Sequence, residues 1–314
     1  EKNIMFADSL IYLTIDLSDI TYPGLGYLIK GYHYDKLGDL PYATKNYLEL
    51  NRVSIKNKNI VHQLYSLHSL IALKLAWGNK KEALSLQHTR NNLLKNKNII
   101  QLIKNTARNK VKGKANDFFK IQEMSSTLGY VDCYLKLEKF DSASLYLRQG
   151  LKLIEEYDSS RSKSFYGSFI EASIEIDYYS GNYNNVINAI NNAYDNADKI
   201  DLENYDFEFN FFNGLSLIEI GEFDLGVKSL KKADSIFEYQ DIAIYPHQRV
   251  LFEKLLHVSR LRDENEKQIE YLNKLIYVDS IFKLNYHFFE PTITKNFETP
   301  WLIREKEVLI KDLE

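Results

Sequence analysis

The sequence predicts an all-α protein, arranged as a solenoid of about six antiparallel helix pairs. Two observations favour helices. Apolar residues recur at spacings of three and four along most of the chain, and the alternation typical of strands is not sustained anywhere. The chain also has only 5 prolines and 13 glycines, which we expect mostly at turns. A third observation, a pattern that returns about every forty residues, indicates stacked repeats.

The clearest unit is the stretch 31–50, GYHYDKLGDLPYATKNYLEL. Gly31 is small where a facing helix must approach closely, and Gly38 fits the left-handed position that ends a helix. A second helix is expected to begin near Leu40, because Pro41 is tolerated in a first helical turn. Its apolar stripe, which should pack back on the first helix, is formed by Ala43, Tyr47 and Leu50.

The same frame recurs along the chain with equivalent turns at positions 38, 78, 138, 181, 221 and 263, at intervals of 40, 60, 43, 40 and 42 residues. The segments that carry it include LAWGNKKEALSLQHTR, LKLEKFDSASLYLRQG, YYSGNYNNVINAINNA, IEIGEFDLGVKSLKKA and the weaker RLRDENEKQIEYLNKL, where Leu272 and Leu275 supply the stripe. Each turn is followed by small and apolar residues at helical spacing. We therefore interpret each interval as one helix pair.

This pattern resembles the tetratricopeptide repeat (TPR), whose helix pairs place small residues where the helices cross. The resemblance covers residues 24–280. A TPR unit has a period of about 34 residues, so the units here are longer and the repeats lack the family tryptophan. The resemblance implies a right-handed, TPR-like α-solenoid with extended helices and a role in binding proteins or peptides.

Three regions follow from this frame: an N-terminal capping helix in 1–23, a repeat array in 24–285, and a linker and helix in 286–314. The tripeptide Tyr22-Pro23-Gly24 is interpreted as the turn before the first full unit. We expect the last helix, after Pro300, to be cut short by the end of the given sequence. That helix is also a candidate for homodimer formation.

The interval of 60 residues contains a surplus near 92–120, where lysines dominate. We expect an extra lysine-coated helix or a lengthened pair, since runs of charge usually mark a solvated face. The alternative is a site for an anion or acidic partner at Lys110, Lys112 and Lys114.

Composition restricts the possible functions. A formal net charge of −3 provides no general attraction for nucleic acid, and a single cysteine, Cys133, excludes an internal disulfide framework. The seven histidines lack the spacing of zinc ligands, and Gly24-Leu25-Gly26 lacks the third glycine of a dinucleotide site. We predict no metal, no cofactor and no enzyme activity, although a pair of carboxylates that meets only in the fold remains an alternative.

The candidate binding surface is the groove lined by the first helix of each pair. Projection of the repeat frame places polar and aromatic residues there: Tyr32, Asp35, Tyr65, His68, Asp132, Lys136, Glu171, Glu175, Tyr178, Tyr179, Glu208, Phe211, His257 and Arg260. Tyrosine and arginine often anchor interfaces, although each of these side chains could equally serve packing or solvation. The carboxylate clamp of some TPR proteins is absent, because Leu28, Tyr32, Ser69, Ser125 and Gly129 occupy its positions.

A second resemblance concerns the C-terminal end. The segment 297–310 resembles the junction in bacterial regulators that place a TPR-like array before a membrane helix and a DNA-binding domain. It implies a periplasmic sensor portion of a membrane-tethered signalling or transcription-regulatory protein, linked to the membrane only through segments outside this sequence. The alternatives are a stand-alone scaffold and a cytosolic peptide-responsive regulator.

Overall fold

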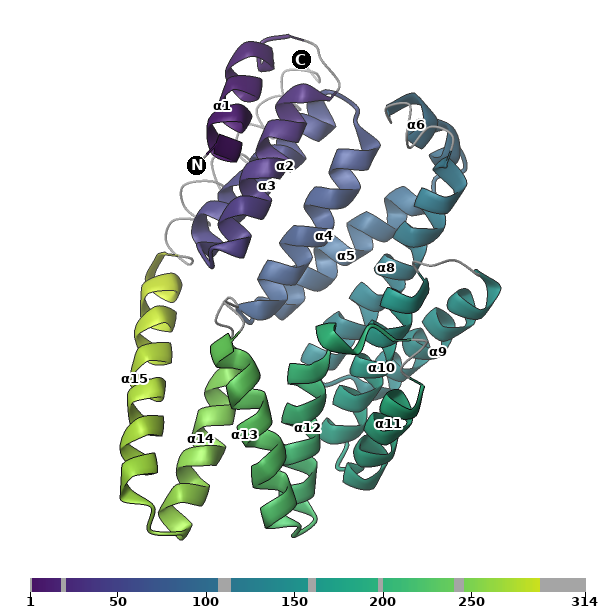
Figure 1. The fold of residues 1–314 in the computed structure, drawn as a ribbon. Helices are drawn as coiled ribbons and strands as arrows, with labels where there is room; N and C mark the ends of the chain where they lie inside the picture. The colour runs from purple at the N-terminus through teal and green to yellow at the C-terminus, as the bar shows by residue number, and fades with distance from the viewer. Residues whose placement is uncertain are drawn as a thin grey trace.

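The computed structural model describes residues 2–17, 21–106, 114–157, 162–196, 200–239 and 246–288. Helices provide all of the regular secondary structure in these ranges, which confirms the all-α prediction (Figure 1). None of the helices in the described part of the chain is both long and apolar enough to cross a lipid bilayer. The predicted helix after Pro300 lies outside the described residues.

In the described ranges, α1 (Lys2–Thr14) is followed by six hairpin pairs of helices, and a short helix lies between the second and third pairs. The pairs are α2 (Tyr22–Lys36) with α3 (Leu40–Lys56), α4 (Ile60–Ala76) with α5 (Lys80–Leu94), α8 (Ala115–Lys136) with α9 (Phe140–Glu156), α10 (Ser162–Tyr179) with α11 (Tyr183–Asp195), α12 (Asp206–Glu219) with α13 (Phe223–Tyr239), and α14 (Pro246–Leu261) with α15 (Asn265–Phe288). A 3-10 turn, Leu202–Asn204, precedes α12.

Every predicted turn position has a left-handed backbone. Glycine occupies four of them, with φ between +70° and +92° at Gly38, Gly78, Gly181 and Gly221. The other two are Glu138 and Asp263, with φ of 61° and 52°. The turn at Asp39 also caps the next helix, because its carboxylate accepts a hydrogen bond from the backbone N–H of Tyr42 at 3.3 Å.

The stripe of the first unit is buried as predicted, since Ala43, Tyr47 and Leu50 are all 0% exposed. Gly31 allows the Tyr47 ring to enter, because a Cβ at Gly31 would lie 2.4 Å from Tyr47 Cε1. Gly150 receives the ring of Phe169 in the same way, at 2.2 Å. These contacts correct the expectation that the glycines lie mostly at turns, because many of them stand inside helices where another element packs closely.

Two details of the sequence interpretation are wrong. Tyr22-Pro23-Gly24 is the first turn of α2 and not a turn before it, because proline suits the first helical positions. In α15 the stripe is shifted by one residue: Tyr271 and Val278 are buried, whereas Leu272 is 41% exposed. Leu275 is buried as expected.

The long interval has a structural explanation. It contains α6 (Ile99–Thr106) and a first helix, α8, that is extended to 22 residues. Ile99, Ile103 and Phe118 are buried in one apolar cluster, so the segment is anchored to the array. Lys114 is exposed, and Lys110 and Lys112 lie outside the described residues.

The first helices of successive pairs contact one another in the order α2, α4, α8, α10 and α12, and each second helix packs on the next first helix. The main apolar cluster lies in the last three pairs and includes Phe209, Leu230, Phe252 and Val278. At the far end, α15 contacts α3, so the array turns back towards its beginning (Figure 1).

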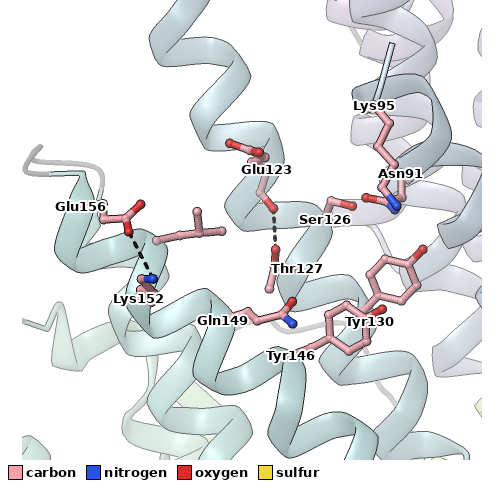
Figure 2. A pocket seen from close by; sticks show the side chains of 11 residues that line it. Asn91, Lys95, Glu123, Ser126, Thr127, Tyr130, Tyr146, Gln149, Lys152 and Glu156 are labelled. Carbon is pink, nitrogen blue, oxygen red and sulfur yellow. Dashed lines mark hydrogen bonds and ion pairs between the residues drawn. The ribbon is translucent and has the colours of Figure 1, made fainter. Parts of the chain in front are cut away.

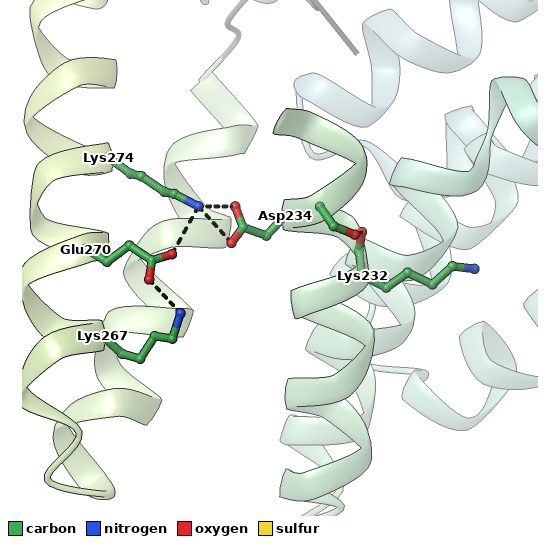
Figure 3. A network of polar contacts seen from close by, with 6 residues as sticks. Lys232, Asp234, Lys267, Glu270 and Lys274 are labelled. Atoms are coloured by element: carbon green, nitrogen blue, oxygen red, sulfur yellow. Dashed lines mark hydrogen bonds and ion pairs between the residues drawn. The ribbon is translucent and has the colours of Figure 1, made fainter. Parts of the chain in front are cut away.

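A polar network ties α15 to the pair before it (Figure 3). Lys274 on α15 donates to both carboxylate oxygens of Asp234 on α13, at 2.8 and 2.9 Å. Its ammonium group also lies 3.5 Å from Glu270, which accepts a hydrogen bond from Lys267 at 2.6 Å. Asp234 is 7% exposed, so this contact combines charge with burial.

Candidate functional site

The surface formed by the first helices carries the residues that sequence analysis selected, and we call it the first-helix surface. Its most open aromatic side chains are Tyr32 on α2 and Tyr179 on α10, which are 47% and 51% exposed. His68 on α4 is also exposed. These side chains remain accessible to a ligand.

Three consecutive first helices bring five charged residues together. Asp132 and Lys136 come from α8, Glu171 and Glu175 from α10, and Glu208 from α12. Lys136 Nζ lies 3.2 Å from Glu175 Oε2, and it is the only basic residue of the group. We call these five residues the acidic cluster, because four carboxyl groups share one ammonium group.

Burial and the crowding of carboxyl groups raise the pKa values of Asp132, Glu171 and Glu208. The pKa of Asp132 is raised to about 7, mainly by burial and also by Glu175, while Lys136 opposes the shift. Burial also raises the pKa of Glu171 well above its ordinary value, with Glu208, Glu175 and Asp132 adding to the effect. Near neutral pH, Asp132 is therefore about half protonated, and the pKa of Glu171 is shifted in the same direction.

The pKa values of Glu208 and Lys136 are also raised. Burial raises the pKa of Glu208, with Glu175 adding to the shift. Desolvation alone would lower the pKa of Lys136, but Glu175 and Tyr179 outweigh it and the net direction is upward. A cation entering this part of the surface would allow more of the carboxyl groups to ionise.

Some predicted groove residues serve packing instead. Phe211 is only 3% exposed and its ring stacks on Phe207 at 6.1 Å between centroids, so its assignment to the groove is wrong. Tyr65 is half-buried against the Phe118 ring, at 5.9 Å. Tyr178 is half-buried against Phe212.

Asp35 is also drawn inwards, since its carboxylate accepts a hydrogen bond from the Tyr47 hydroxyl at 3.4 Å and burial raises its pKa. His257 and Arg260 on α14 are exposed, and neither forms a hydrogen bond or ion pair within the described residues. The structure therefore brings the α8, α10 and α12 residues together and leaves those of α14 apart from them.

A cavity of about 450 Å³ opens on the other side of α8, between α5 and α9, and sequence analysis missed it. Figure 2 shows its lining, in which Tyr130 and Tyr146 stack with centroids 4.5 Å apart. Burial raises the pKa of Tyr130 to about 12, with contributions from Tyr146 and Tyr134. Lys95, Lys152, Glu123 and Glu156 add charges of both signs.

No group of three or more His, Cys, Asp or Glu side chains within the described ranges is arranged to hold a metal ion. Cys133 is buried in the array, and burial raises the pKa of its thiol. No protein-family model matches the chain, and no curated protein matches it. Ideas about function therefore depend on the geometry described above.

Proposed function

We propose that the chain is a non-enzymatic binding module, a right-handed TPR-like solenoid that holds a peptide or protein segment along its first-helix surface. The observation that carries the proposal is the acidic cluster, whose carboxyl groups come from three helices. Burying ionisable groups without equal numbers of opposite charges costs free energy. A ligand that supplies positive charge would reduce that cost.

The chemistry of the cluster favours lysine or arginine side chains in the ligand. Four carboxyl groups face one ammonium group, and a nearby cation would lower the raised pKa values of Glu171 and Asp132 and so favour their ionised forms. Tyr179 is half-exposed beside Lys136 and Glu175, where its ring could cover the aliphatic part of a bound side chain. We therefore propose a basic peptide segment as the ligand class.

Fluorescence polarisation with labelled peptides tests this function. Peptides of equal length, rich either in lysine or in glutamate, should differ in affinity by about tenfold or more in favour of lysine, and the difference should shrink at high salt. Glu171→Gln and Glu208→Gln should weaken lysine-peptide binding. Asp195→Asn on α11, a second helix, is the matched control. Equal affinity for both peptides, or equal effects of the cluster and control variants, would refute the proposal.

We further propose that binding serves signalling, in keeping with the predicted sensor portion of a membrane-tethered bacterial regulator. The contact between α15 and α3 supports this idea, because a change in curvature would alter the spacing of the two ends of the array. Hydrogen exchange separates this role from that of a scaffold. A sensor should show changed protection in α3 and α15 when a lysine peptide binds, whereas a scaffold should change only on the first helices near the peptide.

One observation favours a second candidate, acid–base catalysis at the acidic cluster. A carboxyl group whose pKa is raised by burial and by a neighbouring carboxyl group, as that of Asp132 is beside Glu175, is a common feature of acid–base enzymes. Hydrolysis of glycoside or peptide substrates that is lost in Asp132→Asn would support it. Binding of lysine peptides without turnover would support the non-enzymatic module.

A further inference from the structure

Arg90 on α5 is one of the largest fully buried side chains, with 1% exposure. Its guanidinium crosses to α8, where Nη2 donates hydrogen bonds to Gln122 Oε1 at 2.8 Å and to Ser125 Oγ at 2.9 Å. Its Nε has no hydrogen-bond partner in the described structure. Arg90 was not selected from the sequence, because it lies on a second helix.

No carboxylate balances this charge within the described ranges. Lys74 on α4 provides the contrast, since it is 2% exposed and forms an ion pair with Glu82 at 3.0 Å. Buried charges in proteins are normally paired, because desolvation of an isolated charge is costly. Desolvation accordingly lowers the pKa of Arg90 to about 10, and no acidic group offsets the shift. Arg90 is therefore a buried positive charge with no carboxylate beside it in the part of the chain that the structure describes.

The charge is close to the first-helix surface. Ser125 Oγ, which accepts a hydrogen bond from Arg90, lies 3.4 Å from Nδ1 of His68, and the His68 ring is exposed. Protein nonetheless surrounds this ring closely, so desolvation lowers its pKa to about 4 and Arg90 adds to that shift. At neutral pH the ring is therefore uncharged and can donate one hydrogen bond.

We propose that Arg90, Ser125 and His68 form a subsite that binds a carboxylate of the ligand, on the same surface as the acidic cluster. Ser125 and His68 would contact the carboxylate directly, and Arg90 would supply the opposite charge from behind them. A single guanidinium beside an uncharged imidazole matches one negative charge. This inference rests on the proposed function and makes the ligand class more specific.

The position of the subsite sets the spacing of charges in the ligand. Ser125 and Asp132 are seven residues apart on α8, two helical turns, so they project from the same side about 10 Å apart along the axis. An extended chain covers that distance in about three residues. The ligand is therefore a segment whose carboxylate and basic side chain lie about three residues apart.

The first experiment uses acetate as the probe and the whole chain. At constant ionic strength, replacing chloride with acetate should raise the melting temperature of the wild-type protein in a saturable way. It should also shift the NMR signals of the His68 ring and of Arg90 Nε–Hε. His68→Ala, Ser125→Ala and Arg90→Met should each weaken acetate binding, by about tenfold for Arg90→Met, since the positive charge behind the subsite is lost. Lys74→Met, which removes a buried but paired cation, is the control and should leave it unchanged.

The second experiment measures binding of capped peptides. The peptide EAAK, acetylated and amidated, should bind more tightly than QAAK with the same caps, and Ser125→Ala should abolish the difference. A free terminal carboxylate is tested with acetylated KAAA that ends in an acid or an amide. A preference for the acid in this pair assigns the subsite to the chain terminus, and a preference for EAAK assigns it to an acidic side chain.

The experiments distinguish failure of the carboxylate subsite from failure of the proposed basic ligand class. Lysine peptides that bind through Glu171 with no dependence on Arg90, Ser125 or His68 would overturn the carboxylate subsite and leave the proposed function intact. Acetate binding that depends on Arg90, without any preference for lysine peptides, would overturn the basic ligand class instead. If Arg90→Met does not fold, Ser125→Ala and His68→Ala decide the matter, because both lie nearer the surface.

Discussion

The contact between Gly31 and Tyr47 allows a double-mutant test of how the helix pairs are packed. In Gly31→Ala the new methyl group would lie 2.4 Å from the Tyr47 ring, which is fully buried and has little room to move. Overpacking of this kind costs about 1–3 kcal/mol, while alanine in place of glycine inside a helix gains about 1 kcal/mol. The net effect in the wild-type background is a loss of about 0–2 kcal/mol.

Tyr47→Ala on its own should cost about 3–5 kcal/mol, as for removal of a buried aromatic ring. In that background the methyl group of Gly31→Ala enters vacant space, so only the helical gain of about 1 kcal/mol remains. The sign of the Gly31→Ala effect therefore reverses, and the coupling energy between the two sites is about 1–3 kcal/mol.

Urea unfolding followed by circular dichroism measures the free energies of the four proteins, and hydrogen exchange in α2 and α3 gives a local check, because repeat arrays can unfold in parts. Ala43→Leu, which should cost about 1–3 kcal/mol by overpacking, tests the same interface from the other side. An equal effect of Gly31→Ala in both backgrounds would mean that the ring does not occupy the space beside Gly31.

Three further predictions concern other parts of the array. Asp234→Ala should cost about 2–4 kcal/mol and speed hydrogen exchange in α15, because it leaves Lys274 without its main partner. Lys267→Met, at an exposed site, should leave the stability and the exchange in α15 essentially unchanged. Because its pKa is raised in the folded state, Asp132 binds more protons there than in the unfolded state between about pH 4 and pH 7, so stability falls as pH rises through that window. In thermal unfolding, Asp132→Asn should therefore be more stable than wild type by about 1–3 kcal/mol at pH 8 and equally stable at pH 4. The same difference at both pH values would contradict the raised pKa of Asp132. Glu138→Gly should raise stability in urea by about 1 kcal/mol, since φ of 61° is strained for a side chain with a Cβ; no gain would mean that the ion pair with Lys80 at 3.8 Å matters more than the backbone.

Local features of the repeats could be predicted from sequence because they depend on neighbouring residues. The left-handed turn at Gly38 and the buried stripe through Tyr47 both follow from spacing within a single unit. The pattern was less decisive in α12, where Phe207, Phe209, Phe211 and Phe212 point to several different sides of the helix. The sequence therefore did not indicate that Phe211 faces inwards.

Features that depend on stacking were only partly predictable. The residues of the acidic cluster were selected one by one, but the raised pKa values of Asp132, Glu171 and Glu208 arise only when α8, α10 and α12 are placed side by side. Arg90 and the cavity beside Tyr130 were not predicted, because both depend on second helices, whereas the predicted binding surface lies on the first helices. Attention to long side chains on second helices could have found Arg90.

The contact between α15 and α3 has a consequence for how this protein can change in size. An open-ended array tolerates duplication or deletion of a unit, since each unit touches only its neighbours. Here an inserted pair would push the final helix away from the first pair, and a deleted pair would make them collide. The contact therefore fixes the number of helix pairs. Substitutions within a unit should be tolerated more easily than the gain or loss of a whole unit.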